Sequence, residues 1–206
     1  MNRSKIFAAF ALTLMTAAPP LAAETWTFEL DPAATSVRFH FGATLHTVHG
    51  SLRATEGRIE LDPATGEASG RIVFDATSAE TGNARRDEKM HEKILESERY
   101  PQMVYTVRRV TGTLNPAGRS EMQLRGALEM HGVSRPLDVL ATADVAGGRV
   151  TAEGTLTLPY LDWGMTDPSF FVLRVEKQVH VTLEAVGRLS IAGDAPAAAE
   201  PAAPAP

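Results

Sequence analysis

Apolar and polar residues alternate with a period of two through most of this chain. In the segment 121–130, Met122, Leu124 and Leu128 share one face of an extended chain, while Gln123 lies on the other. Alternation over that length favours a half-buried strand over a helix. The same pattern or composition predicts further strands at 25–30, 36–42, 57–61, 69–76, 102–110, 136–145, 150–158 and 179–185.

Short turn signals separate these segments, among them Asp31-Pro32, Asn115-Pro116 and Gly147-Gly148. Short connections favour antiparallel hairpins over helical crossovers. One apolar and one polar face on each strand fits an antiparallel sheet with one wet side, and closing that sheet removes its exposed edges. We therefore predict an all-β fold, a closed antiparallel β-barrel of about eight strands. A two-sheet sandwich would show the same alternation and stays an alternative.

Several inward positions carry very small residues. Such positions can leave room for a ligand inside a barrel of about eight strands. They can equally allow tight packing against a neighbouring aromatic ring, so they do not by themselves predict a cavity. The positions are Gly126, Ala141, Ala143, Ala152, Gly154 and Ala185.

The segment 81–101 breaks the alternation and predicts one inserted α-helix. Asn83 can cap its first turn, and Asp87 sits where the helix dipole favours negative charge. Tyr100-Pro101 is expected to end it, since proline disfavours helix at the preceding residue. The helix carries only a narrow apolar stripe, so we expect it to lie across a mouth or side of the barrel. The stripe is Met90, Ile94 and Leu95.

The two ends of the chain differ in composition from the middle. Residues 1–23 read as a cleavable signal peptide, with Arg3 and Lys5 before the apolar run 6–15. Residues 24–192 are one domain's length of chain. The Pro/Ala-rich segment 193–206 is expected to be disordered, because it has too little apolar surface to offset its chain entropy. We therefore expect residues 1–23 to direct export of the domain.

Charge and cysteine content narrow the classes of partner. The net charge is −5, and removal of the two cations of the signal peptide makes it more negative. This balance disfavours nucleic acid and anionic membrane surfaces as primary partners. The chain has no cysteine, so the fold depends on its core alone.

Candidate chemical groups are sparse. His46 and His49 suggest a metal site, with His91 and His131 as further ligands, but residues three apart on a strand point to opposite faces. We expect no metal site and no cofactor.

The carboxylates Asp162, Asp167 and Glu176 lie near Trp163, but their spacing in a loop fixes no catalytic separation. The chain contains no G-x-S-x-G nucleophile motif. We do not expect an enzyme.

The segment 160–173 is unusually rich in apolar residues for a loop, including Trp163, Phe170 and Phe171. An exposed apolar loop of this kind either folds over a barrel mouth or contacts a partner or membrane. We therefore expect these side chains to form a functional surface.

Several short pieces in the range 26–189 resemble, in order and spacing, the YceI-like lipid/polyisoprenoid-binding proteins. The most specific piece is Thr81-Gly82-Asn83 with Arg86-Asp87, followed by Tyr100-Pro101. Further pieces are 31–33 with 36–39, 57–63, 126–128 with 131–136, and 179–184. The chain departs from the family pattern at 90–97 and 158–171.

The resemblance implies a lipocalin-like barrel in the periplasm that holds a long isoprenoid or other amphiphilic lipid. The hypothesis is a binding or carrier protein for a polyisoprenoid or isoprenoid quinone, with transient contact to a membrane or membrane protein. The expected ligand-binding residues are Phe39, Phe41, Phe74, Met90, Ile94, Leu95, Tyr105, Leu124, Leu156, Trp163, Phe170 and Phe171.

Four residues of the most specific piece are expected to pin the helix to the barrel or to form a polar rim: Asn83, Arg86, Asp87 and Tyr100. The alternative function is a ligand-free envelope-stress or interaction module whose 160–173 loop is a protein interface. Both a monomer and a homodimer are compatible with the sequence.

Overall fold

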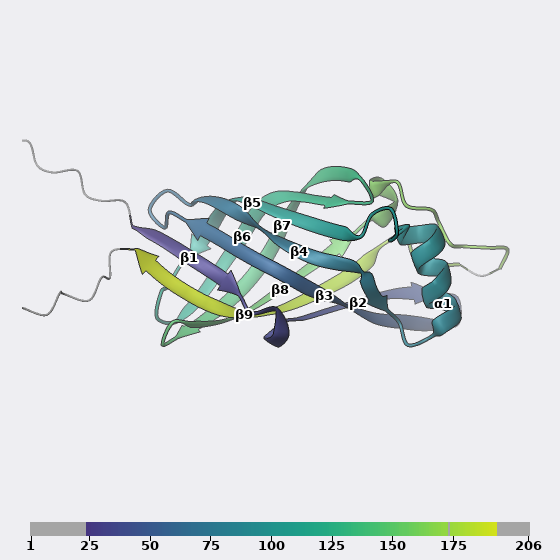
Figure 1. Ribbon diagram of the computed structural model, residues 1–206, viewed down its shortest axis with the longest axis horizontal. Helices are drawn as coiled ribbons and strands as arrows, with labels where there is room; N and C mark the ends of the chain where they lie inside the picture. The colour runs from purple at the N-terminus through teal and green to yellow at the C-terminus, as the bar shows by residue number, and fades with distance from the viewer. Residues whose placement is uncertain (1–23, 173, 193–206) are drawn as a thin grey trace, which may run out of the picture.

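The computed structural model describes residues 24–172 and 174–192, and within them the strands form one antiparallel sheet that closes on itself (Figure 1). The predicted signal peptide and C-terminal tail lie outside the described residues. The sheet order is β1-β3-β2-β9-β8-β7-β6-β5-β4, and pairing of β3 with β4 closes the barrel. The strands are β1 (Thr25–Leu30), β2 (Ser36–Ala43), β3 (His46–Leu61), β4 (Glu67–Glu80), β5 (Gln102–Thr113), β6 (Arg119–Met130), β7 (Val133–Ala146), β8 (Arg149–Leu158) and β9 (Val179–Ala192).

The first two strands share one position in the wall. Both β1 and β2 pair with β3 on one side and with β9 on the other. The short 3-10 turn η1 (Pro32–Ala34) separates them, and Asp31 N–H donates to Val186 O across the break at 2.7 Å. The predicted closed barrel of eight strands is therefore confirmed, and the sandwich alternative is excluded by the β3–β4 pairing.

The strand prediction located every strand but made β3 too short. That strand begins at His46, well before the predicted segment 57–61. Its first half contains His49, Gly50 and several other polar residues, which hide the alternation. Register shifts at Ser51/Arg53 and Ala54/Glu56 interrupt the period further.

The predicted helix begins as expected and ends earlier. Its first part is α1 (Ala84–Lys89), and it continues as the π-helical turn η2 (Met90–Leu95). Asn83 caps it, because its side-chain oxygen accepts from Arg86 N–H at 3.1 Å. The prediction that Tyr100-Pro101 ends the helix is wrong. Glu96 adopts a left-handed conformation (φ 45°) and stops it, and its carbonyl then accepts from Arg99 and Tyr100 N–H in a following turn.

The two ends of the barrel differ. The helix end carries α1, the β2–β3 hairpin and the 3-10 turn η3 (Tyr160–Trp163). The opposite end, called here the turn end, carries the β5–β6 and β7–β8 connections and the paired residues Thr25 and Ala192 (Figure 1). In the described part of the chain, no helix has the length and apolarity needed to cross a membrane.

Candidate functional site

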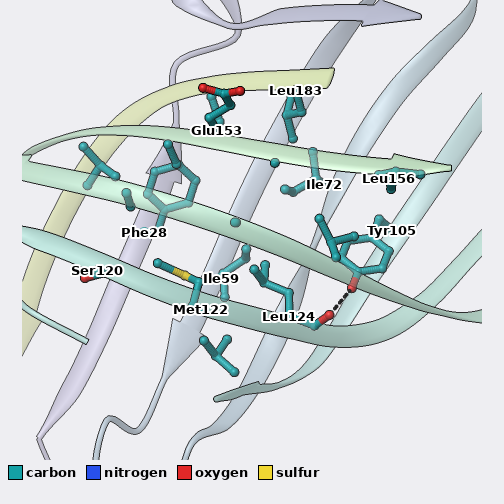
Figure 2. A pocket seen from close by; sticks show the side chains of 18 of the residues that line it. Phe28, Ile59, Ile72, Tyr105, Ser120, Met122, Leu124, Glu153, Leu156 and Leu183 are labelled. Carbon is teal, nitrogen blue, oxygen red and sulfur yellow. Dashed lines mark hydrogen bonds between the residues drawn. The ribbon is translucent and has the colours of Figure 1, made fainter. Parts of the chain in front are cut away.

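The barrel encloses an apolar cavity of about 240 Å³ (Figure 2). Its wall consists of inward-facing side chains that the two-residue period of the strands places on one face. The larger lining residues are Trp26, Phe28, Val37, Leu52, Ile59, Leu61, Ile72, Phe74, Met103, Tyr105, Val110, Leu114, Met122, Leu124, Leu128, Leu137, Val139, Val145, Val150, Leu156, Leu158, Val181, Leu183 and Leu189.

Small side chains on adjacent strands explain why this barrel is not filled. Ala141 faces Gly154 across the β7–β8 pair, and Ala143 faces Ala152. Ala185 of β9 pairs with Ala152 on the other side. All five line the cavity, so one sector of the wall projects almost nothing into the interior.

Gly126, which has the same small size, serves a different purpose. A Cβ atom added at Gly126 would lie 3.1 Å from the Tyr105 ring and 2.2 Å from the carbonyl oxygen of Thr106. This glycine lets the Tyr105 ring approach the backbone of β6 and does not line the cavity. The two interpretations of small inward residues therefore apply to different positions of the same wall.

The Tyr105 hydroxyl is a polar group in the middle of the apolar wall. It lies within hydrogen-bonding distance of two carbonyl oxygens, at 3.1 Å from Leu124 O and 3.0 Å from Leu137 O (Figure 2). Burial raises the pKa of Tyr105 above its usual value of 10, with a smaller contribution from Asp138. The phenol is therefore neutral at physiological pH, and its proton is already engaged by the barrel wall.

The cavity extends to the turn end of the barrel. Ser120 lines it there and is only 3% exposed. Its hydroxyl accepts from Asn115 N–H at 2.9 Å and lies 3.4 Å from Asn115 O. Asn115 also lines the cavity and is exposed to solvent, so the cavity approaches the surface at the β5–β6 connection.

The helix end, in contrast, is closed by packed side chains. Tyr160, Trp163 and Met165 form a plug there, with Trp163 only 3% exposed. Trp163 Nε1–H donates to Leu128 O at 3.0 Å, which ties the plug to β6. Trp163 does not line the cavity. The expectation that it contributes to an exposed loop surface is wrong, because its ring packs in the core.

Four of the residues expected to bind a ligand line the cavity together: Phe74, Tyr105, Leu124 and Leu156. The others lie elsewhere. Phe39 is buried against Gly50, and Phe41 stacks beside Phe39 at a ring-centroid distance of 6.4 Å. Phe28, Met122 and Leu183 also line the cavity but are not among the expected ligand-binding residues. The alternation of their strands already indicates that they face inward.

The helical residues do not reach the cavity either. Ile94 and Leu95 are half-buried and pack on the core, and Met90 is half-buried. Phe170 and Phe171 lie outside the barrel and are 70% and 84% exposed. A mouth formed by the helix and this loop is therefore not what the structure shows, because the plug occupies that end.

Two of the four residues expected to pin the helix to the barrel, Arg86 and Asp87, converge on Thr81, which follows β4. Arg86 Nε–H donates to Thr81 Oγ1 at 2.6 Å and Arg86 Nη2–H to Thr81 O at 2.9 Å. The Asp87 carboxylate accepts from Thr81 N–H at 3.0 Å and from its hydroxyl. Thr81 thus joins Arg86 and Asp87, and these bonds fix the start of α1. Tyr100 lies farther on, beside His131, with 4.6 Å between ring centroids.

The histidines considered for a metal site have other neighbours. His91 lies 2.9 Å from Ser97 Oγ and 2.9 Å from Ala79 O, which attaches the helix to β4. His131 and Gly132 form the β6–β7 turn with positive φ angles of 53° and 74°. Among residues 24–172 and 174–192, no group of three or more histidine or carboxylate side chains is placed to hold a metal ion.

The carboxylate of Asp167 makes local hydrogen bonds that hold the loop around it. Its hydrogen bonds from Ser169, followed by the nearby Lys177 and Arg174, lower its pKa below the usual range. Lys177 Nζ lies 3.8 Å from it.

The amino-acid sequence of the barrel matches a family of known proteins. The family model of the YceI-like domain matches residues 28–187, which is most of the chain. The chain belongs to the YceI-like family. This YceI-like chain is also 30% identical over 129 residues to a UPF0312 protein of Pseudomonas savastanoi pv. phaseolicola. The matched stretch covers 59% of this chain and 65% of that relative's length.

A longer match joins this YceI-like chain to a UPF0312 protein of Pseudomonas putida strain GB-1. The two are 29% identical over 180 residues, or 80% of this chain and 88% of the relative.

Two solved structures share the fold. One is a polyisoprenoid-binding domain from Saccharophagus degradans implicated in plant cell wall breakdown, with a TM-score of 0.62, 17% identity, and 78% and 97% of the two chains covered. The other is BcnA of Burkholderia cenocepacia, with a TM-score of 0.61, 16% identity, and 76% and 98% covered. At these identities the likeness of this YceI-like chain to both concerns the fold.

Proposed function

We propose that this protein binds one long apolar molecule, such as a polyisoprenoid or an isoprenoid quinone, inside the barrel. The observation that carries the proposal is the apolar cavity itself. Five small residues on β7, β8 and β9 keep it open, and Tyr105, its central polar group, is engaged by backbone carbonyls. The description of the Saccharophagus degradans domain as polyisoprenoid-binding supports the same class of ligand.

The size and chemistry of the cavity suit a narrow chain. A volume of about 240 Å³ is slightly smaller than that of most small-molecule sites, which span roughly 300–1,000 Å³. Each methylene transferred from water to such a wall contributes about 0.8 kcal/mol. A long chain therefore gains affinity from its length alone, and the wall imposes little preference on its detailed structure.

A carrier role in the periplasm follows from this proposal together with the predicted signal peptide. The barrel would shield the chain from water between two membranes or between a membrane and an acceptor. The direct test is native mass spectrometry of protein purified from its own periplasm, followed by organic extraction. A discrete added mass of an isoprenoid or fatty chain supports the carrier. A bare protein that also takes up no quinone or prenol contradicts it.

A matched pair of variants tests whether the cavity is the binding site. Ala141→Phe places a ring in the cavity from β7, whereas Ala146→Phe places the same ring on an exposed position of the same strand. We expect the first variant to lose at least ten-fold in affinity for a prenol and the second to bind like the parent. Equal affinity in both variants would place the site elsewhere.

The exposed tip Phe170–Val172 favours a second candidate function, an interaction module. The three side chains are 70%, 84% and 79% exposed, and Thr44 Oγ1 lies 3.2 Å from Val172 O and holds the tip beside the β2–β3 hairpin. Apolar residues this exposed are unusual unless they meet a partner. A protein that co-purifies with the lipid-free parent but not with Phe171→Asp would support this function.

A further inference from the structure

We propose that the bound amphiphile has a fixed direction, with its tail toward the plug and an uncharged polar head at Asn115 and Ser120. This inference rests on the proposed function and adds the entry end, the orientation and the class of headgroup. It depends on three features: the distribution of polar groups along the cavity, the charge of its lining, and the difference between its two ends.

Polar side chains are sorted along the cavity. Ser120 lies at one side of the view in Figure 2, and Tyr105 and Leu156 lie at the other. Tyr105 offers no free donor, since its proton is directed at backbone carbonyls. The Ser120 hydroxyl is likewise engaged with the Asn115 backbone. Asn115 Oδ1 accepts from Ala117 N–H at 3.0 Å, so the Asn115 amino group is the donor that remains for a quinone or alcohol oxygen.

The charge of the lining indicates an uncharged head. Among the described lining residues there is no lysine, arginine or histidine, and the single ionisable carboxyl is that of Glu153. Glu153 is exposed and lies between Ala152 and Gly154, which face the cavity, so its carboxylate belongs to the outer wall. Arg119, which follows the turn next to Ser120, does not line the cavity and lies near the carboxylates of Glu121 and Asp144. A phosphate at this site would therefore give up part of its hydration without a cation among the lining residues, which is unfavourable. An alcohol, amide or quinone carries no such cost.

The ends of the cavity determine which part of the ligand enters first. Trp163, held to Leu128 O, closes the helix end. At the turn end, exposed Asn115 borders the cavity. A tail that enters from the turn end lies along the apolar wall of the cavity, and the head stays beside Asn115 and water. The opposite orientation would bury a polar head against the plug.

The chain provides its own reporters, because its two tryptophans mark the two ends. Trp26 lines the cavity at the turn end, and Trp163 is part of the plug at the helix end. Decylubiquinone is a suitable probe, since its quinone head quenches indole fluorescence at close range and its tail does not. The variant Trp163→Phe keeps only the reporter at the turn end, and Trp26→Phe keeps only the reporter in the plug.

We expect saturating decylubiquinone to quench Trp26 at least three-fold more strongly than Trp163. Stronger quenching of Trp163, or equal quenching of both, would overturn the proposed direction, as would quenching of neither while native mass spectrometry shows the quinone bound. Absence of the added mass in the parent protein instead contradicts ligand binding itself. The two failures are therefore distinguishable.

A second measurement on the unchanged protein tests the headgroup class without any substitution. Geranylgeraniol and geranylgeranyl phosphate share one tail and differ in the charge of the head. We expect the alcohol to displace decylubiquinone at a concentration at least ten-fold lower than the phosphate. Equal or tighter binding of the phosphate would overturn the assignment of an uncharged head.

Discussion

The Tyr105 hydroxyl shows how a single buried polar atom adds pH dependence to this barrel. Its phenol lies in an apolar wall, and both oxygens near it are backbone carbonyls, which interact favourably only with the protonated form. Burial raises its pKa in the folded state above the unfolded value of about 10. The pKa of Tyr160 is raised in the same direction, by burial first and then by Asp167.

The sign of the resulting pH dependence follows from proton binding. Above pH 10 the unfolded chain releases the Tyr105 proton and the folded chain keeps it, so the free energy of unfolding decreases as pH rises. The decrease for one such group is at most about 1.4 kcal/mol per pH unit. We expect Tyr105→Phe to lose less stability than the parent between pH 10 and 11, as measured by urea denaturation. Parallel curves for the two proteins over that interval would refute the assignment.

Two turn glycines give a second prediction for single residues. Gly132 and Gly147 both have positive φ angles, 74° and 57°, in tight hairpin turns at opposite ends of the barrel. A Cβ at Gly132 would lie 2.8 Å from the Tyr100 ring, whereas a Cβ at Gly147 has nothing within 4 Å. We expect Gly147→Ala to cost about 1 kcal/mol from the backbone alone and Gly132→Ala to cost clearly more. Thermal unfolding of both variants measures the difference, and equal costs would mean that Tyr100 does not constrain this turn.

At the scale of elements, the helix depends on side-chain bonds more than on apolar packing. Ile94 and Leu95 are its contacts with the core, and both are only half-buried. Thr81 anchors its start through Arg86 and Asp87, and His91 attaches its second turn to Ala79 of β4. A helix with so little buried surface would be marginal in isolation, so these bonds determine its position.

Asp87→Ala tests this anchoring. The substitution leaves the half-buried Thr81 N–H and hydroxyl without their carboxylate acceptor, and we expect a loss of about 1–3 kcal/mol in the free energy of unfolding. Glu88→Ala, at an exposed neighbouring position, is the matched control and should stay within about 0.5 kcal/mol of the parent. Amide hydrogen exchange should show faster exchange over 84–95 in the first variant alone. Unchanged exchange there would assign the anchoring to other contacts.

The strands could be predicted from sequence, and the cavity could not. In any extended strand, Met122 and Leu124 lie on the same face, because the two-residue period depends only on the geometry of the strand backbone. Whether Gly154 opens space or accommodates a ring depends on the residue opposite, and that is set by register across strands. The prediction that Trp163 is exposed failed for a similar reason. The sequence of a loop does not show that the indole of Trp163 will donate a hydrogen bond to Leu128 O.

For the molecule as a whole, a cavity that exists only in the folded barrel makes ligand binding and folding interdependent. A prenol that fills the cavity binds the folded barrel and not the unfolded chain, so it should stabilise by mass action. Free farnesol at 100 times its dissociation constant should raise the free energy of unfolding by about 2.7 kcal/mol. Ala141→Phe should show little of this gain at the same concentration. An equal gain in that variant, measured by urea denaturation, would indicate binding outside the barrel.

The pairing of Thr25 with Ala192 has a practical consequence for anyone who handles this protein. Both residues lie at the turn end, the same end that the cavity approaches at Asn115 (Figure 1). An affinity tag or fluorescent protein joined directly before Thr25 or directly after Ala192 would therefore be attached next to the proposed entrance. Uptake assays should use protein from which such additions have been cleaved, and immobilisation through engineered sites at the helix end would leave that entrance free.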